Sequence, residues 1–128
     1  MAVHIIRVFR DLSDVGSRRE PEKSSFFYKD IDHLCTGVWE PNTDIFETKD
    51  NVFIRVELAG IAQKDITVKV KNGKLMITGV RKSVKSEDQI YFHQMEIHCG
   101  KFNKVIALPL SLEHNDIQAE LQEGLLEI

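Results

Sequence analysis

The chain has 128 residues, with 17 Lys and Arg against 20 Asp and Glu, and 42% of its residues are hydrophobic. This length fits one domain with a single core, and the net charge of −3 argues against a protein that binds the phosphate backbone of nucleic acids. The hydrophobic residues are too frequent for a disordered chain and too interrupted by charges for a membrane span.

The first ten residues place apolar side chains at the offsets of one helical face, at Ala2, Ile5, Ile6 and Phe9. Charged residues interrupt this stretch, which is therefore not typical of a secretory signal, and we expect a cytoplasmic protein. A polar segment with Gly and Pro follows at residues 13–25 and predicts a break or linker.

The aromatic cluster Phe26-Phe27-Tyr28 comes next and lacks strict strand alternation. Residues 1–38 are too few and too polar to build a core of their own. We predict that they form a partly helical or disordered N-terminal arm. Two interpretations of the arm remain equally supported: it covers the flank of the domain, or it contacts other proteins.

From Trp39 onward, apolar and polar residues alternate with a period of two, which is typical of strands with one buried face. The dipeptide Asn72-Gly73 between two such runs predicts a tight hairpin turn. Many short strands separated by turn residues indicate an all-β, two-sheet antiparallel sandwich over residues 39–128. The predicted strands are Asp44–Thr48, Val52–Leu58, Ile66–Lys71, Leu75–Thr78, Ile90–His98, Phe102–Leu108, Ile117–Gln122 and Leu125–Ile128.

A charged segment at residues 81–89 is long for a hairpin connection, and long loops often carry function. The apolar cluster Ile90-Tyr91-Phe92 ends it. As an exposed strand edge this cluster would be costly, whereas pairing with a second copy across a two-fold axis would bury it.

The two cysteines, Cys35 and Cys99, have neither the number of a disulfide framework nor the spacing of a metal knuckle, and we expect two reduced thiols. On a strand, His93 and Cys99 face one way and His98 the other, so they do not converge on a metal ion. No set of nucleophile, base and metal ligands argues for a hydrolase. We expect no catalytic residues, no metal and no cofactor.

An ordered series of motifs resembles the α-crystallin domain of small heat-shock proteins over residues 39–128. The resemblance implies an immunoglobulin-like sandwich and ATP-independent holding of unfolding proteins. The motifs are Trp39-Glu40-Pro41, Asp44–Glu47, Val56–Ile61, Asp65–Val70, Leu75–Gly79, Glu96, Gly100-Lys101-Phe102, Leu108-Pro109, Ile117–Ala119 and Gly124–Ile128.

The long loop resembles that of the bacterial, archaeal and plant members, in which a loop strand crosses to a partner subunit. The resemblance therefore implies a homodimer in which Ile90, Tyr91 and Phe92 form the exchange strand and pair near the partner's segment 44–48. Gln94, Asn103 and Ala107 stand where family members often carry arginines. The family's flexible tail with an Ile-x-Ile plug does not follow Ile128, so we expect dimers or small oligomers.

The family also has a groove between two edge strands, at residues 65–71 and 116–122 here, where such a plug docks. Strand periodicity fits plain core packing of the six residues equally well. The spacing of Leu126-Glu127-Ile128 matches a plug, although a last strand after Gly124 explains it far better. The residues that would line the groove are Ile66, Val68, Val70, Ile117, Ala119 and Leu121.

A protein that holds unfolding clients needs exposed apolar surface rather than a nucleophile. The arm would supply such surface for clients or assembly. We therefore predict a chaperone that binds itself and unfolding client proteins; the alternative is a co-chaperone-like module with one defined partner. The predicted arm contacts are Ile5, Ile6, Val8, Phe9, Phe26, Phe27 and Tyr28.

Overall fold

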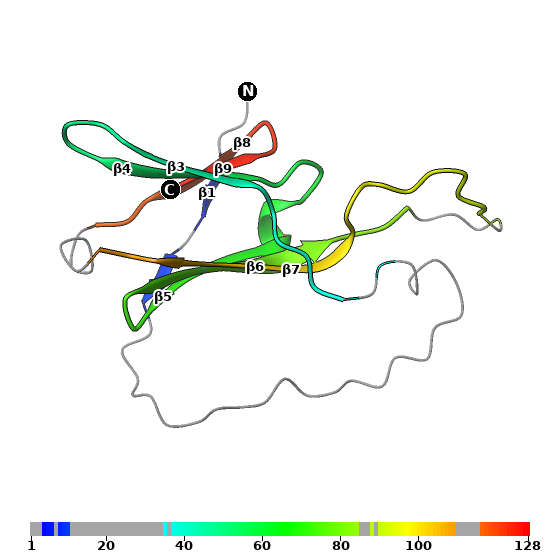
Figure 1. The fold of residues 1–128 in the computed structure, drawn as a ribbon, viewed down its shortest axis with the longest axis horizontal. Helices are drawn as coiled ribbons and strands as arrows, with labels where there is room; N and C mark the ends of the chain where they lie inside the picture. The colour runs from blue at the N-terminus through cyan, green and yellow to red at the C-terminus, as the bar shows by residue number, and fades with distance from the viewer. Residues whose placement is uncertain are drawn as a thin grey trace.

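The computed structural model describes residues 4–6, 8–10, 35, 37–84, 88, 90–109 and 116–128. Two layers of strands face each other in this part of the chain (Figure 1). The elements are β1 (His4–Ile6), β2 (Val8–Arg10), β3 (Thr43–Glu47), β4 (Val52–Glu57), the short 3-10 helix η2 (Gln63–Asp65), β5 (Ile66–Lys71), β6 (Lys74–Arg81), β7 (Gly100–Ala107), β8 (Ala119–Gln122) and β9 (Leu125–Glu127).

One layer is a five-stranded sheet in the order β1-β8-β9-β4-β3, and the other is a four-stranded sheet in the order β2-β5-β6-β7. Every pairing is antiparallel except that of β2 with β5, which is parallel. The predicted all-β sandwich of two sheets is therefore confirmed, with one parallel pair in place of a wholly antiparallel arrangement.

The hairpin of β5 and β6 turns at Asn72 and Gly73, whose φ angles of 51° and 70° are both positive. Consecutive positive φ angles match the twist of the flanking strands, and Asn-Gly adopts them at little cost. Glu123 and Gly124 repeat this geometry between β8 and β9, with φ angles of 50° and 79°. Local sequence chemistry thus sets the register of both hairpins.

The core lies between the sheets and consists of the apolar residues that the alternation predicts. Fully burying one such side chain stabilises the fold by roughly 1.5–3 kcal/mol. The buried set is Ile54, Val56, Leu58, Ile61, Ile66, Val68, Val70, Leu75, Ile77, Phe102, Ile106, Ala119, Leu121 and Leu126.

One predicted strand after residue 39 is wrong. The predicted strand Ile90–His98 has no strand pairing in the structure. Its absence has a topological reason: β6 and β7 pair with each other as far as Arg81 and Gly100, so the connection leaves the sheet before this segment and joins no strand edge among the described residues. The predicted strand Ile117–Gln122 is present but begins two residues later, at Ala119.

The predicted helical face in the first ten residues is also wrong, because His4–Ile6 and Val8–Arg10 are strands. The edges of β8 and β5 offer free backbone groups with which they pair, and β-branched residues such as Ile and Val favour strands over helices. The cluster Phe26-Phe27-Tyr28 lies outside the described residues.

Cys35 and Cys99 form a disulfide, which corrects the expectation of two reduced thiols. Their Cα atoms lie 5.0 Å apart, within the range that a disulfide spans. The fold brings them together because Gly100 packs directly on the backbone of Cys35: a Cβ atom on Gly100 would lie 2.6 Å from the Cys35 carbonyl oxygen. Spacing along the chain does not reveal this contact.

Candidate functional site

The first described residues run along the open edge of the sandwich and cross from one sheet to the other (Figure 1). In the five-stranded sheet, Ile6 pairs with Ala119 of β8; in the four-stranded sheet, Val8 pairs with Val68 of β5. Val8 is half-buried and packs against the core. We call β1 and β2 together the N-terminal seam, because they join the two sheets at this edge.

The six residues predicted to line a groove do come together at this edge. Five of them, on β5 and β8, are at most 7% exposed and belong to the core, whereas Ile117 precedes β8 and is half-buried. The N-terminal seam pairs with the outer backbone of both strands. The chain's own first residues thus pair with the two strand edges between which the groove is predicted.

The opposite edge of the five-stranded sheet is β3, which pairs with β4 and with no other strand of the described residues. Ile54 exchanges both backbone hydrogen bonds with Ile128, on the side of β4 that faces away from β3. Ile45 lies opposite Ile54, so its own N–H and C=O point outward, away from the sheet. The side chains of Ile45 and Phe46 are exposed as well, so this edge can accept another strand.

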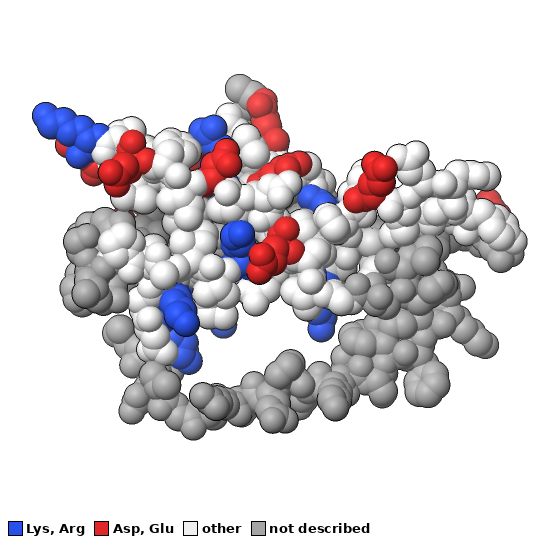
Figure 2. Space-filling view, viewed as in Figure 1, with Lys and Arg blue, Asp and Glu red and all other residues white. Residues whose placement is uncertain are grey.

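The connection between β6 and β7 projects from the sandwich (Figure 1). Its described side chains include exposed apolar residues: Tyr91 is 73% exposed and Ile97 77%, with Phe92 and Met95 exposed to a lesser degree. Ile90 is half-buried. Figure 2 shows the corresponding part of the molecule, at its right, as largely uncharged. Residues 90–97, which we call the apolar projection, present the kind of surface that a monomer rarely leaves open.

A cluster around Trp39 fixes the base of the projection. The Trp39 indole N–H donates to the Gly100 carbonyl at 3.2 Å, and its ring stacks on His98 and packs against Phe102. The Arg81 guanidinium lies 4.5 Å from the Trp39 ring centroid. Sequence reasoning missed this cluster, because its members are spread over residues 39–102, half of the chain.

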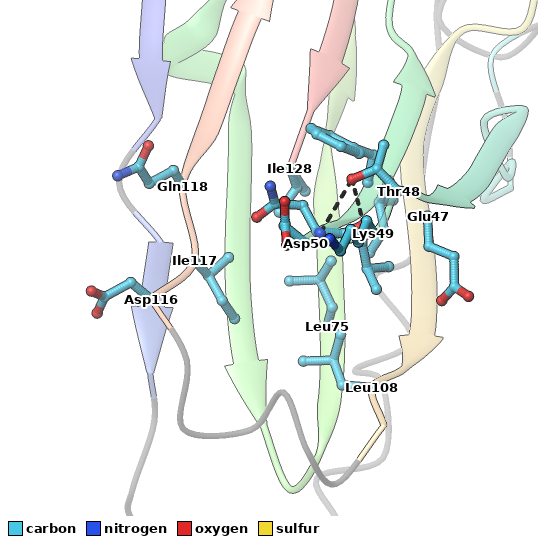
Figure 3. Close-up of a pocket in the computed structure, with 14 residues that line it drawn as sticks. Glu47, Thr48, Lys49, Asp50, Leu75, Leu108, Asp116, Ile117, Gln118 and Ile128 are labelled. Carbon is cyan, nitrogen blue, oxygen red and sulfur yellow. Dashed lines mark hydrogen bonds between the residues drawn. The ribbon is translucent and has the colours of Figure 1, made fainter.

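A cavity of about 620 Å³ opens at the end of the sandwich beside the turn between β3 and β4 (Figure 3). Figure 3 shows Ile117 facing Leu75 and Leu108 across it. Backbone and hydroxyl hydrogen bonds between Thr48 and Asn51 hold the turn that forms its polar rim. The lining mixes apolar side chains with the charged side chains of Glu47, Lys49, Asp50 and Asp116, and these do not form a convergent catalytic set.

In the part of the chain that the structure describes, no three His, Cys, Asp or Glu side chains gather around one point. His93 and His98 stay apart from such a group, and Cys99 is bound to Cys35. Helices among the described residues are too short and too polar to reach across a lipid bilayer.

The profile of the Hsp20/alpha crystallin family matches residues 44–128. Small heat shock protein C2 of Rickettsia felis is 36% identical over 88 residues, which make up 69% of this chain and 57% of that protein. The present chain thus spans little more than half the length of this relative.

Solved structures of small heat-shock proteins are also similar to this chain. The hspA structure from Xanthomonas axonopodis superposes with a TM-score of 0.63 at 34% identity, covering 71% of this chain and 91% of that one. A small heat-shock protein from Xylella fastidiosa gives a TM-score of 0.63 at 33% identity over 71% of this chain and 84% of that one. With the matched profile, these likenesses show that the chain belongs to the Hsp20/alpha crystallin family of small heat-shock proteins.

Proposed function

We propose that this protein is an ATP-independent chaperone that binds unfolding proteins through apolar surface and suppresses their aggregation. The observation that carries the proposal is the apolar projection, in which Tyr91 and Ile97 are each more than two-thirds exposed on a member of this family. Membership of the family does not favour the alternative of a co-chaperone-like module with one partner.

The test is to heat a model client with substoichiometric protein in the absence of nucleotide and to follow light scattering. We expect slower aggregation, and less protection by the double variant Met95→Ser/Ile97→Ser, whose positions lie outside the exchange strand proposed below. The matched control Val105→Ser/Leu125→Ser also removes two exposed apolar side chains, but outside both the projection and residues 1–38, and should protect as the wild type does. A client that precipitates as fast as in buffer at every ratio would refute the proposal.

We further propose that two copies form a dimer in which Ile90, Tyr91 and Phe92 of one copy add to the outer edge of the other copy's β3. Two features support this pairing: the outward backbone groups of Ile45, and the exposure of Tyr91 and Phe92, which pair with no strand among the described residues. The structure of the Xylella fastidiosa relative reveals a distinct high-order structure for that protein, and assembly beyond the dimer is open to measurement by native mass.

We also propose that residues 1–38 act as an arm on the domain 39–128 and contribute client or assembly contacts. Its proposed contacts outside the described residues are Phe26, Phe27 and Tyr28; those within the N-terminal seam are Ile5, Ile6, Val8 and Phe9. A second segment that docks on β5 and β8 would have to displace the seam. Deleting residues 1–38 should weaken aggregation suppression while leaving the sandwich folded; an equally active truncation would contradict this.

The proposed place of action is the cytoplasm, where newly made clients unfold. The Cys35–Cys99 bond is compatible with that compartment, because the disulfides that occur there are usually transient or redox-sensing. Fractionation of cells that produce the full chain, with immunodetection, tests this placement.

A further inference from the structure

The Cys35–Cys99 bond joins two parts of the molecule that the proposed function treats separately. Cys35 lies near the end of the arm, and Cys99 lies between the apolar projection and the first residue of β7. Both cysteines are half-buried rather than sealed in the core. A small thiol can therefore reach the pair.

Trp39 and Gly100, which lie close to the two cysteines in the sequence, are held by contacts other than the bond. The backbone N–H of Trp39 donates to the Lys101 carbonyl at 3.1 Å, and the backbone carbonyl of Trp39 accepts from the Asn103 N–H at 3.1 Å. These two bonds hold Trp39 alongside β7. Gly100 adopts a φ of +88°, where it packs on the Cys35 carbonyl without a Cβ atom in the way. These contacts bring Cys35 beside Cys99, and the hydrogen bonds that hold Trp39 on β7 do not involve the bond.

The disulfide is therefore a second attachment of this segment, at Cys35, four residues before the attachment that Trp39 makes to β7. With the bond broken, β7 still holds Trp39, and the sandwich keeps its strand pairings, none of which involves either cysteine. What changes is the restraint on the chain that precedes Trp39. The aromatic cluster at residues 26–28 lies a short distance before Cys35 in the sequence.

We propose that Cys35 and Cys99 form a thiol–disulfide exchange site that fastens the arm to the base of the projection when oxidised and releases it when reduced. A dithiol reductant is the co-reactant. One of its thiolates attacks a cysteine sulfur and forms a mixed disulfide, and the other cysteine leaves as a thiolate and takes a proton. The second reductant thiol then displaces the first cysteine, so that two electrons and two protons pass to the protein and the reductant ends as a disulfide.

The consequence for chaperone activity rests on the proposed function. Reduction removes a covalent link close in sequence to the proposed client contacts at residues 26–28, while β1 and β2 keep their pairings, so we expect those contacts to meet clients more readily. The reduced protein is accordingly the more active form. The exchange reaction and the release are measurable without any client.

The experiment compares the full chain equilibrated with glutathione disulfide and with dithiothreitol. After removal of the reagent, alkylation followed by mass measurement should add no group to the oxidised chain and two groups to the reduced chain. Amide hydrogen exchange in peptides that span residues 35–38 should rise several-fold on reduction, with no change in β5 and β6. The variant Cys35→Ser/Cys99→Ser should exchange like the reduced chain under both conditions.

Two results would overturn the site: both thiols stay open to alkylation after equilibration with glutathione disulfide, or exchange at residues 35–38 is the same in both states. A scattering assay with a cysteine-free client then tests the consequence. We expect the reduced protein to protect the client at least about twofold better per mole than the oxidised protein. If the thiols respond to the reagents but both forms protect equally, the proposed effect of reduction on the arm's client contacts is overturned. If neither form protects while the thiols respond, the chaperone proposal fails and the exchange site stands.

Discussion

The Arg81 guanidinium lies over the ring of Trp39, with its central carbon 4.5 Å from the ring centroid. The same guanidinium donates to two carbonyl oxygens, that of Ala59 at 3.0 Å and that of His98 at 2.9 Å. One side chain thus ties the end of β6 to the turn after β4 and to the returning limb of the projection. The projection is anchored at its base although its outer part is exposed.

Replacing Arg81 with Met should lower the free energy of unfolding by about 1–2 kcal/mol, because the cation–π contact and two charge-assisted hydrogen bonds are lost at a partly exposed site. The free energy of unfolding of Arg81→Lys should lie between those of the wild type and Arg81→Met, since an ammonium group keeps the charge but lacks the planar fork of the guanidinium. Urea unfolding at a fixed protein concentration measures both. Lys69→Met, at an exposed position of β5, is the control and should change stability by less than about 0.5 kcal/mol.

Gly79 on β6 has no room for a side chain. A Cβ atom there would overlap the carbonyl oxygen of Asp65 and lie 2.5 Å from Cζ of Phe102, whose ring is buried. Gly79→Ala should therefore destabilise the fold by about 1–3 kcal/mol through overpacking, even though alanine suits a strand better than glycine. Thermal unfolding checks this against Val80→Ala at the exposed neighbouring position. A Gly79→Ala protein as stable as the control would show that Phe102 moves aside freely.

The outward N–H of Ile45 gives a direct test of strand addition at β3. Ile45→Pro removes that N–H without touching a hydrogen bond between β3 and β4, and proline is tolerated on strand edges in this orientation. We expect the dimer to dissociate at concentrations at which the wild type stays paired, as measured by native mass and sedimentation. Ile45→Thr keeps the N–H and a β-branched side chain and should remain dimeric. Two proteins with the same mass distribution would argue against exchange at this edge.

Val8 is the described contact of the N-terminal seam with the core. Val8→Asp loses about 1 kcal/mol of apolar burial and places a carboxylate in a half-buried site, so β2 should detach from β5. Amide exchange at the outward-facing positions of Ile66–Lys71 should then rise at least about tenfold, while the pairing of β6 with β7 stays protected. Val84→Asp adds the same charge at an exposed position and should leave β5 unchanged.

Features that local chemistry determines were predictable from the sequence, and those that depend on distant partners were not. The β5–β6 hairpin follows from alternation and from Asn72-Gly73, and the buried set on β5 follows from the same alternation. Residues His4–Ile6 carry no comparable local signal, because they become a strand only where the free edge of β8 is present. The Cys35–Cys99 bond depends on the close approach at Gly100, which sequence spacing does not encode.

Ile6 of β1 pairs with Ala119 of β8, so the ribosome synthesises the two strands of this pair far apart in time. At about 5–20 residues per second, synthesis of the hundred or so residues between them takes on the order of 10 s. During that interval the hairpin of β5 and β6 can emerge and pair, but β1 has no strand to join. Biosynthesis therefore passes through a stage in which β2 can already pair with β5 while β1 still lacks a strand partner, and this edge of the five-stranded sheet forms only after β8 has emerged.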